Sequence, residues 1–209
     1  MKIVLITGMS GAGKTAICKN LCERYDKFNF VFSYTDRDMR EENEWGHTFI
    51  DSKYMDLLLK SSDIVAQTVI DGNRYCTIKN QFDEDKINLY TVDVNGINDT
   101  LRSFPHADIM IVLIKRLRIQ ENYDRVNRKI SIPSREDVDF VINNDSDIEL
   151  SANLLNTFVN FNFFKKKSRG VLELNEKIEY IDKQYELLNH IRQSLYKELK
   201  QNNNKDFNF

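Results

Sequence analysis

The residues best suited to chemistry stand in one short segment near the start of the chain, Gly8-Met9-Ser10-Gly11-Ala12-Gly13-Lys14-Thr15. The segment fits the pattern G-x-x-x-x-G-K-[ST], with a short β-branched apolar run before it and a predicted helix after it. In such a loop, backbone N–H groups surround a β-phosphate, and the start of the helix adds partial positive charge. Lys14 is expected to bridge the β- and γ-phosphates of a nucleoside triphosphate, and Thr15 to ligate Mg²⁺. The expected triphosphate contacts are Gly8, Ser10, Gly11, Ala12, Gly13, Lys14 and Thr15.

A second candidate site is the segment from Ser33 to Arg40. Arg37 and Arg40 lie three residues apart in an acidic stretch, where two guanidinium groups could hold a second phosphate in line with the first. That phosphate would belong to an acceptor, and the two sites together would form a transfer site. The alternative is that the two arginines pair with neighbouring acidic side chains at the surface. The spacing alone does not decide between these interpretations.

The elements that must position these residues alternate between strands and helices. Lys2 to Thr7 is predicted to be a fully buried strand, because the run is short, β-branched and ends at glycine. A helix capped by Ser52 is predicted up to Leu59, and Asp71-Gly72-Asn73 predicts a hairpin turn. The other predicted elements are a helix from Lys14 to Tyr25, a loop from Asp36 to Gly46, and strands at Phe28 to Tyr34, Ile64 to Ile70, Arg74 to Thr77, Leu89 to Val94, Ile109 to Leu113 and Phe140 to Ile142.

The predicted architecture is an α/β domain over residues 1–150. Strands that alternate with helices imply right-handed crossovers, and hence a parallel sheet flanked by helices. The hairpin breaks this alternation, so we expect a small β-rich insertion at about residues 33–77. Beyond residue 150 apolar residues recur with heptad-like spacing, which predicts a helical extension over residues 151–209 with a frayed end. Residues 171–200 are expected either to pack back on the core or to form a homodimer.

The overall composition restricts the possible binding partners and the cellular compartment. The 209-residue chain has a formal net charge of −2, so it lacks the global basic field that attracts nucleic acids. The sequence has no run of about 18 apolar residues, so no membrane span is expected. Three cysteines without paired spacing indicate a reducing compartment, and we expect a cytoplasmic protein. Cys18 and Cys22 lie four residues apart on the predicted helix, where we expect burial in preference to metal binding.

Several blocks of the sequence, taken in order, resemble the guanylate kinase family. The family's S-x-T-T-R-x-x-R segment is matched by Ser33 to Arg40, and its G-N-x-Y-G-[TS] hairpin by Gly72-Asn73-Arg74-Tyr75-Cys76-Thr77. The blocks similar to the family's G-x-D-Y-x-F, D-x-D-x-Q-G and D-x-V-I-x-N-D are Gly46-His47-Thr48-Phe49, Thr91-Val92-Asp93-Val94-Asn95-Gly96 and Asp139-Phe140-Val141-Ile142-Asn143-Asn144-Asp145. The ordered series spans residues 3 to about 150, which makes the resemblance fairly specific.

The resemblance implies a P-loop nucleoside monophosphate kinase that transfers the γ-phosphate of ATP to GMP, dGMP or a related nucleotide, with Mg²⁺ as cofactor. In the family, an arginine-bearing lid closes over the triphosphate, and residues 118–137 resemble it. The implied acceptor-binding residues are Ser33, Arg37, Arg40, Tyr75, Thr77 and Asp93, of which Asp93 also lies near the Mg²⁺ ion. The implied catalytic residues are Lys14, Arg37 and the lid arginines Arg128 and Arg135, with Arg125 as a further ATP contact.

The departures from the family concern the choice of acceptor. Six residues before the hairpin glycine, where the family has a glutamate that reads the guanine edge, this chain has Ala66. Loss of such a bidentate contact costs about 1–3 kcal/mol, and the neighbouring Gln67 could replace it only in part. His47 takes the place of the family's tyrosine, and Thr91 that of the first aspartate in D-x-D. No chemical role is expected for any histidine. Two alternatives stay open: a guanylate-kinase-like binding or scaffold protein with reduced catalysis, and a P-loop kinase of another small acceptor.

Overall fold

The computed structural model describes residues 1–116, 133–145 and 147–165. The first compact unit of the chain runs from Met1 to Phe163 and contains the elements discussed below. None of the helices in this described part has the length and the apolar character needed to cross a bilayer.

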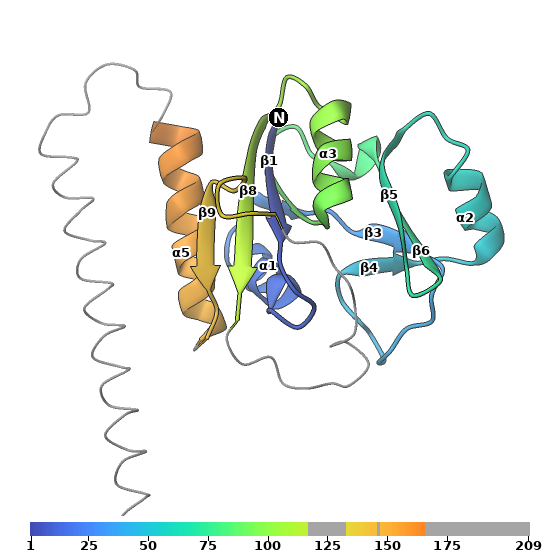
Figure 1. Cartoon of the computed structure of the whole chain (residues 1–209), viewed down its shortest axis with the longest axis horizontal. Helices are drawn as coiled ribbons and strands as arrows, with labels where there is room; N and C mark the ends of the chain where they lie inside the picture. Colours follow the sequence, from blue (N-terminus) through green and yellow to red (C-terminus); the bar gives the residue numbers. More distant parts are fainter. Residues whose placement is uncertain (117–132, 146, 166–209) are drawn as a thin grey trace, which may run out of the picture. The chain divides into compact units, whose positions relative to one another are not determined.

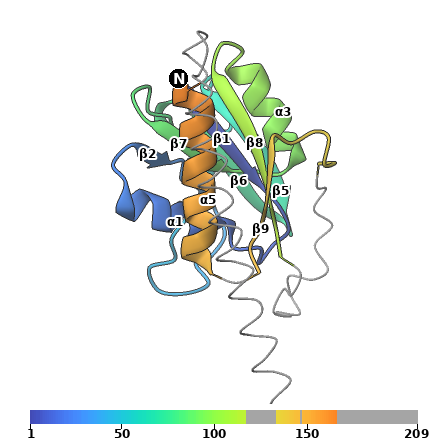
Figure 2. The same cartoon turned by 90° about the vertical axis from the view of Figure 1, so that its left-hand side faces the viewer.

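A five-stranded parallel sheet forms the centre of this unit (Figure 1), and its strand order is β2-β7-β1-β8-β9 (Figure 2). Its strands are β1 (Lys2–Thr7), β2 (Phe28–Phe30), β7 (Ile87–Thr91), β8 (Asp108–Lys115) and β9 (Phe140–Asn143). The central strand β1 is fully buried from Ile3 to Ile6, as its continuous apolar run predicts. The predicted α/β fold with a parallel sheet is therefore confirmed.

In the described part of the chain, three helices cover the two faces of this sheet. They are α1 (Lys14–Arg24), α3 (Val94–Ser103) and α5 (Ile148–Asn160). Helices α1 and α5 lie side by side on one face, where Leu21 and Leu155 are fully buried in a common core (Figure 2). On the opposite face, α3 packs through Ile97 into a second core that contains Leu5 and Tyr90. Both faces of the sheet are thus closed to water, which leaves its ends for a site.

A smaller sheet of order β4-β3-β6-β5 carries the segment that was predicted as an insertion (Figure 1). Its elements are β3 (Ser33–Thr35), β4 (His47–Phe49), β5 (Ile64–Ile70) and β6 (Asn73–Ile78), with helix α2 (Ser52–Leu58) between β4 and β5. The β5–β6 hairpin forms as predicted. Asp71 and Gly72 at its turn have φ angles of 53° and 80°, the positive values that a tight hairpin turn requires.

Two predictions of local structure are wrong. The strand predicted from Phe28 to Tyr34 is two strands, because β2 pairs with β7 in the main sheet whereas β3 pairs with β6 in the smaller one. Helix α2 is capped by Asp51 instead of Ser52, since the Asp51 carboxylate accepts a hydrogen bond from the backbone N of Tyr54 at 2.8 Å. Strand β4 and helix α3 were not predicted.

The end of the compact unit also differs from the expectation. Helix α5 begins at Ile148, so the expected boundary near residue 150 falls inside this helix. Its buried residues belong to the same core as α1, and the unit therefore extends to Phe163. The 3₁₀ helix η1 (Lys79–Gln81) and the π-helix η2 (Phe161–Lys165) complete the described elements.

Candidate active site

The phosphate-binding loop predicted at residues 8–15 connects the carboxyl end of β1 to α1. Two of its glycines stand where a side chain would not fit. Gly8 has a φ angle of 143°, and a Cβ atom there would overlap the backbone carbonyl oxygen of Ile114 in β8. Gly13 has a φ angle of 92°, and a Cβ atom there would overlap the side-chain amide of Asn144. The loop is therefore held close to the neighbouring strand and to the residue that follows β9.

Asn144 braces this loop, a role that its sequence motif did not predict. Its side-chain Nδ2 donates to the carbonyl oxygen of Ala12 at 2.8 Å, and its Oδ1 accepts from Ser151 Oγ at 2.9 Å. Its backbone N donates to the carbonyl oxygen of Lys115 at 2.7 Å. Asn144 is only 2% exposed, and a buried polar group left without a partner costs about 1–3 kcal/mol. The shape of the loop is thus tied to β8 and to the first turn of α5.

Lys14 lies folded over its own loop. Its Nζ donates to the carbonyl oxygens of Gly8 at 2.7 Å and Met9 at 2.9 Å. Burial lowers the pKa of Lys14 to about 8, because desolvation disfavours the charged ammonium. The two carbonyl oxygens carry no net charge. The negatively charged oxygens of a bound phosphate would therefore stabilise the Lys14 ammonium more strongly than these carbonyls do.

The loop that carries the two arginines approaches the phosphate-binding loop. A Cβ atom on Gly46 would lie 3.0 Å from Cγ2 of Thr15. The preceding residue, Trp45, packs against Phe30 and Phe32, with ring-centroid distances of 4.2 and 5.0 Å. This aromatic cluster joins the end of the arginine-bearing loop to the end of β2, beside the predicted Mg²⁺ ligand.

A cavity of about 470 Å³ lies between the phosphate-binding loop and the smaller sheet. Of the triphosphate contacts predicted in the phosphate-binding loop, all line it except Ala12, which is buried. The predicted acceptor-binding residues that line it are Ser33, Arg40, Tyr75, Thr77 and Asp93. The structure therefore brings the two predicted phosphate sites to one cavity.

Arg37, which was also predicted to bind the acceptor, does not line this cavity. Its guanidinium forms a buried ion pair with Glu44, with two N···O distances of 2.9 and 2.5 Å. Its Nε donates to the hydroxyl of Tyr75 at 3.1 Å, and Glu44 also accepts from the backbone N of Arg40 at 2.9 Å. Arg37 thus pairs with an acidic residue, but the pair is buried and does not lie at the surface. The Tyr75 hydroxyl connects Arg37 to the cavity.

The Arg37–Glu44 ion pair is expected to make the free energy of unfolding depend on pH below about 4.5. Hydrogen bonds from Arg37 lower the pKa of Glu44 from 4.5 to about 2. A carboxylate with a lowered folded-state pKa stabilises the fold above its unfolded pKa, and this contribution is lost as pH falls from 4.5 toward 2. The free energy of unfolding of the wild-type protein should therefore fall more steeply with acid than that of Glu44→Gln.

Urea titrations at several values from about pH 7 to about pH 3 measure this difference. Glu42→Gln, which alters an exposed neighbour, is the matched control and should follow the wild-type curve. Equal slopes for the wild type and Glu44→Gln would contradict a stabilising role for the ion pair.

The wall formed by β5 and β6 is where the resemblance places the acceptor's base. Ala66, at the position of the family's guanine-reading glutamate, pairs with Thr77 across the hairpin and is 5% exposed. The Thr77 hydroxyl accepts from Tyr90 OH at 2.9 Å, so its own hydrogen can be donated to another acceptor. Gln67 also lines the cavity, next to Ala66.

His47, for which no chemical role is expected, lines the same cavity. Its Nδ1 lies 2.9 Å from Ser33 Oγ, and its ring lies 5.4 Å from the ring of Tyr75. Burial lowers the pKa of His47 to about 4, and the charge of Arg37 acts in the same direction. The imidazole is therefore neutral near pH 7. Its position directly after Gly46, in a block similar to the family's, was the signal that could have identified it.

Asp93 stands where β7 ends and α3 begins. Its Oδ1 caps α3 by accepting from the backbone N of Gly96 at 2.8 Å, and its Oδ2 accepts from Thr68 Oγ1 at 3.2 Å. This is the carboxyl edge of the parallel sheet, where open α/β sheets bind their ligands. Each carboxylate oxygen has two lone pairs, so these two bonds do not exhaust its capacity to accept.

The predicted lid is described only in part. Arg125 and Arg128 lie outside the described residues, as does the predicted dimer segment, residues 171–200. Arg135 is described, and its Nη1 donates to the carbonyl oxygen of Val138 at 3.3 Å. Arg135 does not line the cavity.

Comparison with known proteins gives similarity over most of the chain. No family model matches it. The chain is 26% identical over 184 residues to a guanylate kinase of Fusobacterium nucleatum, which covers 85% of this chain and 89% of that protein. It is 30% identical over 117 residues to a guanylate kinase of Aromatoleum aromaticum, covering 53% of this chain and 57% of that protein. The crystal structure of guanylate kinase from Anaplasma phagocytophilum matches with a TM-score of 0.58 and 17% identity, over 85% of this chain and 93% of that one. The structural match establishes that the two proteins share a fold.

Proposed function

Because this chain is a divergent member of the guanylate kinase family, we propose that it is a nucleoside monophosphate kinase that transfers the γ-phosphate of ATP to GMP, dGMP or a closely related nucleotide. The observation that carries the proposal is the single cavity lined by Lys14 and Thr15 on one side and by Arg40 and Tyr75 on the other. A donor and an acceptor phosphate held there would share one cavity, and alignment of two bound phosphates supplies much of the catalysis of phosphoryl transfer.

The chain's own residues would act by binding and by offsetting charge. The backbone N–H groups of the loop and Lys14 would hold the β- and γ-phosphates. Arg40 and Tyr75 would bind the acceptor phosphate, and Arg37 would hold the Tyr75 hydroxyl in place through the bond at 3.1 Å. Charge neutralisation and alignment suffice for a loose transition state, so no general base of unusual pKa is required. Arg125, Arg128 and Arg135 complete the proposal as lid residues.

The donor set of the cavity fits Mg²⁺. The Thr15 hydroxyl and the Asp93 carboxylate line the same cavity, and Mg²⁺ is commonly held by one or two carboxylates together with substrate phosphates. A ready-made cluster of three acidic, histidine or cysteine ligands is therefore not required, and the described residues contain none. When bound with ATP, Mg²⁺ would offset the charge of the β- and γ-phosphates.

The identity of the acceptor is the part of the proposal that Ala66 affects most. An alanine offers no carboxylate to the two N–H donors of guanine, and the polar groups beside it are Thr77 and Gln67. A coupled assay of ADP release across the common ribo- and deoxynucleoside monophosphates tests both the activity and the preference. We expect turnover with at least one purine monophosphate. Intact ATP binding without turnover on any of them would refute the kinase and favour a binding protein.

A further inference from the structure

Two residues outside the cavity connect the elements that carry the acceptor-phosphate residues. We propose that Arg74 and Asp36, neither of which lines the cavity, are positioning residues that set the placement of Arg37 and Tyr75. The inference rests on the proposed function, because it concerns the acceptor side of the same site. It assigns a role to two residues that the resemblance does not name as acceptor-binding.

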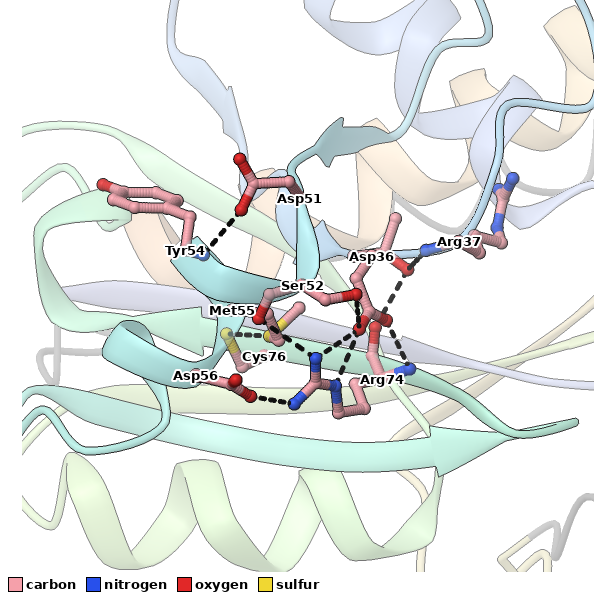
Figure 3. Close-up of polar contacts among 10 residues, drawn as sticks. Asp36, Arg37, Asp51, Ser52, Tyr54, Met55, Asp56, Arg74 and Cys76 are labelled. Atoms are coloured by element: carbon pink, nitrogen blue, oxygen red, sulfur yellow. Dashed lines mark hydrogen bonds and ion pairs between the residues drawn. The ribbon is translucent and has the colours of Figure 1, made fainter.

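Asp36 extends the pairing of β3 with β6 beyond the end of β3. The last strand residue, Thr35, pairs with Tyr75, and its Oγ1 donates to the carbonyl oxygen of Arg74 at 2.9 Å. The Asp36 carboxylate then accepts twice from Arg74, from its backbone N at 2.9 Å and from its Nε at 2.7 Å (Figure 3). A side chain thus continues the ladder where main-chain pairing stops, and it fixes the chain just before Arg37.

Each member of this pair is adjacent in sequence to a residue of the phosphate side. Asp36 precedes Arg37, and Arg74 precedes Tyr75, while Arg37 Nε donates to Tyr75 OH at 3.1 Å. Successive side chains of a strand point to opposite faces, so Arg74 points away from the cavity that Tyr75 lines. The close-up shows the Arg37 side chain directed away from the Asp36–Arg74 contact (Figure 3). A shift of the Asp36–Arg74 pair is therefore expected to displace Arg37 and Tyr75, which follow directly in the chain.

Arg74 also ties this junction to helix α2. Its Nη2 donates to the carbonyl oxygen of Ser52 at 3.2 Å, and its Nη1 forms an ion pair with Asp56 (Figure 3). The helix is anchored in turn by Met55, which is fully buried. One guanidinium therefore joins the end of β3, strand β6 and α2, so the acceptor-phosphate residues rest on a packed helix.

The Asp36–Arg74 ion pair is partly shielded from solvent. The Asp36 side chain is 10% exposed and that of Arg74 is 27% exposed, and partly buried pairs are screened less by salt than surface pairs. Burial acts to raise the pKa of Asp36, but the hydrogen bonds from Arg74 outweigh it and hold that pKa below its ordinary value. Asp36 is therefore ionised at neutral pH, as the contact requires.

The test compares steady-state constants of Arg74→Met with those of the wild-type full chain. We expect KM for the acceptor to rise about tenfold, with KM for ATP unchanged and kcat reduced less than the acceptor KM is raised. Arg74→Lys, which keeps the charge but not the fork of donors, should recover part of the loss. Arg102→Met is the matched control, because Arg102 forms an exposed ion pair with Asp99 on α3 and should leave every constant unchanged.

A second measurement separates positioning from a general loss of structure. Dissociation constants of the preferred acceptor monophosphate and of its nucleoside are compared in the absence of ATP, since only the monophosphate presents a phosphate to Arg40 and Tyr75. In Arg74→Met the dissociation constant of the monophosphate should rise about tenfold, whereas that of the nucleoside should not change. If Arg74→Met fails to fold, Asp36→Asn, which keeps the shape and removes the charge, is measured in the same way.

An equal rise in the dissociation constants of the monophosphate and its nucleoside, an equal rise in the KM values of ATP and acceptor, or no change at all would overturn the inference. These outcomes are distinct from failure of the proposed function, which would appear in the wild-type protein as no turnover with any monophosphate. A wild type that turns over while Arg74→Met keeps its acceptor KM contradicts the positioning role alone.

Discussion

Replacement of Lys14 by alanine is expected to lower kcat by about 10²–10³-fold, which is the usual cost of losing one group that stabilises developing charge. The Lys14 ammonium lies half-buried against two carbonyl oxygens, and the loss of surrounding water lowers its pKa to about 8. A triphosphate would replace these neutral oxygens by charged ones, so the favourable interaction appears when substrate is bound. The effect should therefore fall on catalysis and leave the fold intact.

The measurement is steady-state turnover with both substrates saturating, together with a urea titration. Lys19→Ala is the matched control, because Lys19 lies on the same helix and forms an exposed pair with Glu23 at 3.9 Å. We expect Lys19→Ala to keep the wild-type kcat. Similar turnover in Lys14→Ala and Lys19→Ala would show that Lys14 has no part in the reaction.

Replacement of Gly8 by alanine is expected to lower the free energy of unfolding by about 3 kcal/mol or more. Two costs combine at this position. The φ angle of 143° is one that residues with a Cβ rarely adopt, and the new Cβ would overlap the backbone carbonyl oxygen of Ile114. Backbone cannot rotate away as a side-chain tip can, so either β1 must separate from β8 or the loop must change shape.

Gly72→Ala provides a control that separates these two costs. Gly72 also has a positive φ angle, 80°, but a Cβ atom there would meet nothing within 4 Å. Its substitution should therefore cost only the backbone strain, about 1–2 kcal/mol. Urea unfolding of both variants measures the comparison. A loss in Gly8→Ala no larger than that in Gly72→Ala would show that the approach of β8 does not constrain the loop.

The features that could be predicted from sequence are those whose cause is local. The buried run of β1 and the helix that follows the loop depend on periodicity within one segment, and α1 ends one residue before the predicted Tyr25. The β5–β6 hairpin depends on the turn residues Asp71 and Gly72, which both adopt positive φ angles. In each case neighbours in the sequence decide the conformation.

The features that were missed depend on partners distant in the sequence or on which sheet a strand joins. The apolar alternation from Phe28 onward looks the same whether or not the chain passes from one sheet to another, so the break before β3 left no signal. The partner of Arg37 is Glu44, reached through a loop whose shape no local pattern describes. Asn144 contacts Ala12, which lies 132 residues away. Its bracing role therefore became visible only in the folded chain.

The aromatic cluster beside the cavity provides an intrinsic fluorescent probe of the site. Trp45 is the only tryptophan in the chain, and it both lines the cavity and packs against Phe30 and Phe32. Intrinsic fluorescence excited at the indole band therefore reports on the arginine-bearing loop alone, without a label. A nucleotide that moves this loop should change the emission, so acceptor affinity can be titrated in the absence of ATP. Trp45→Phe, which has no indole emission, is the control for that titration.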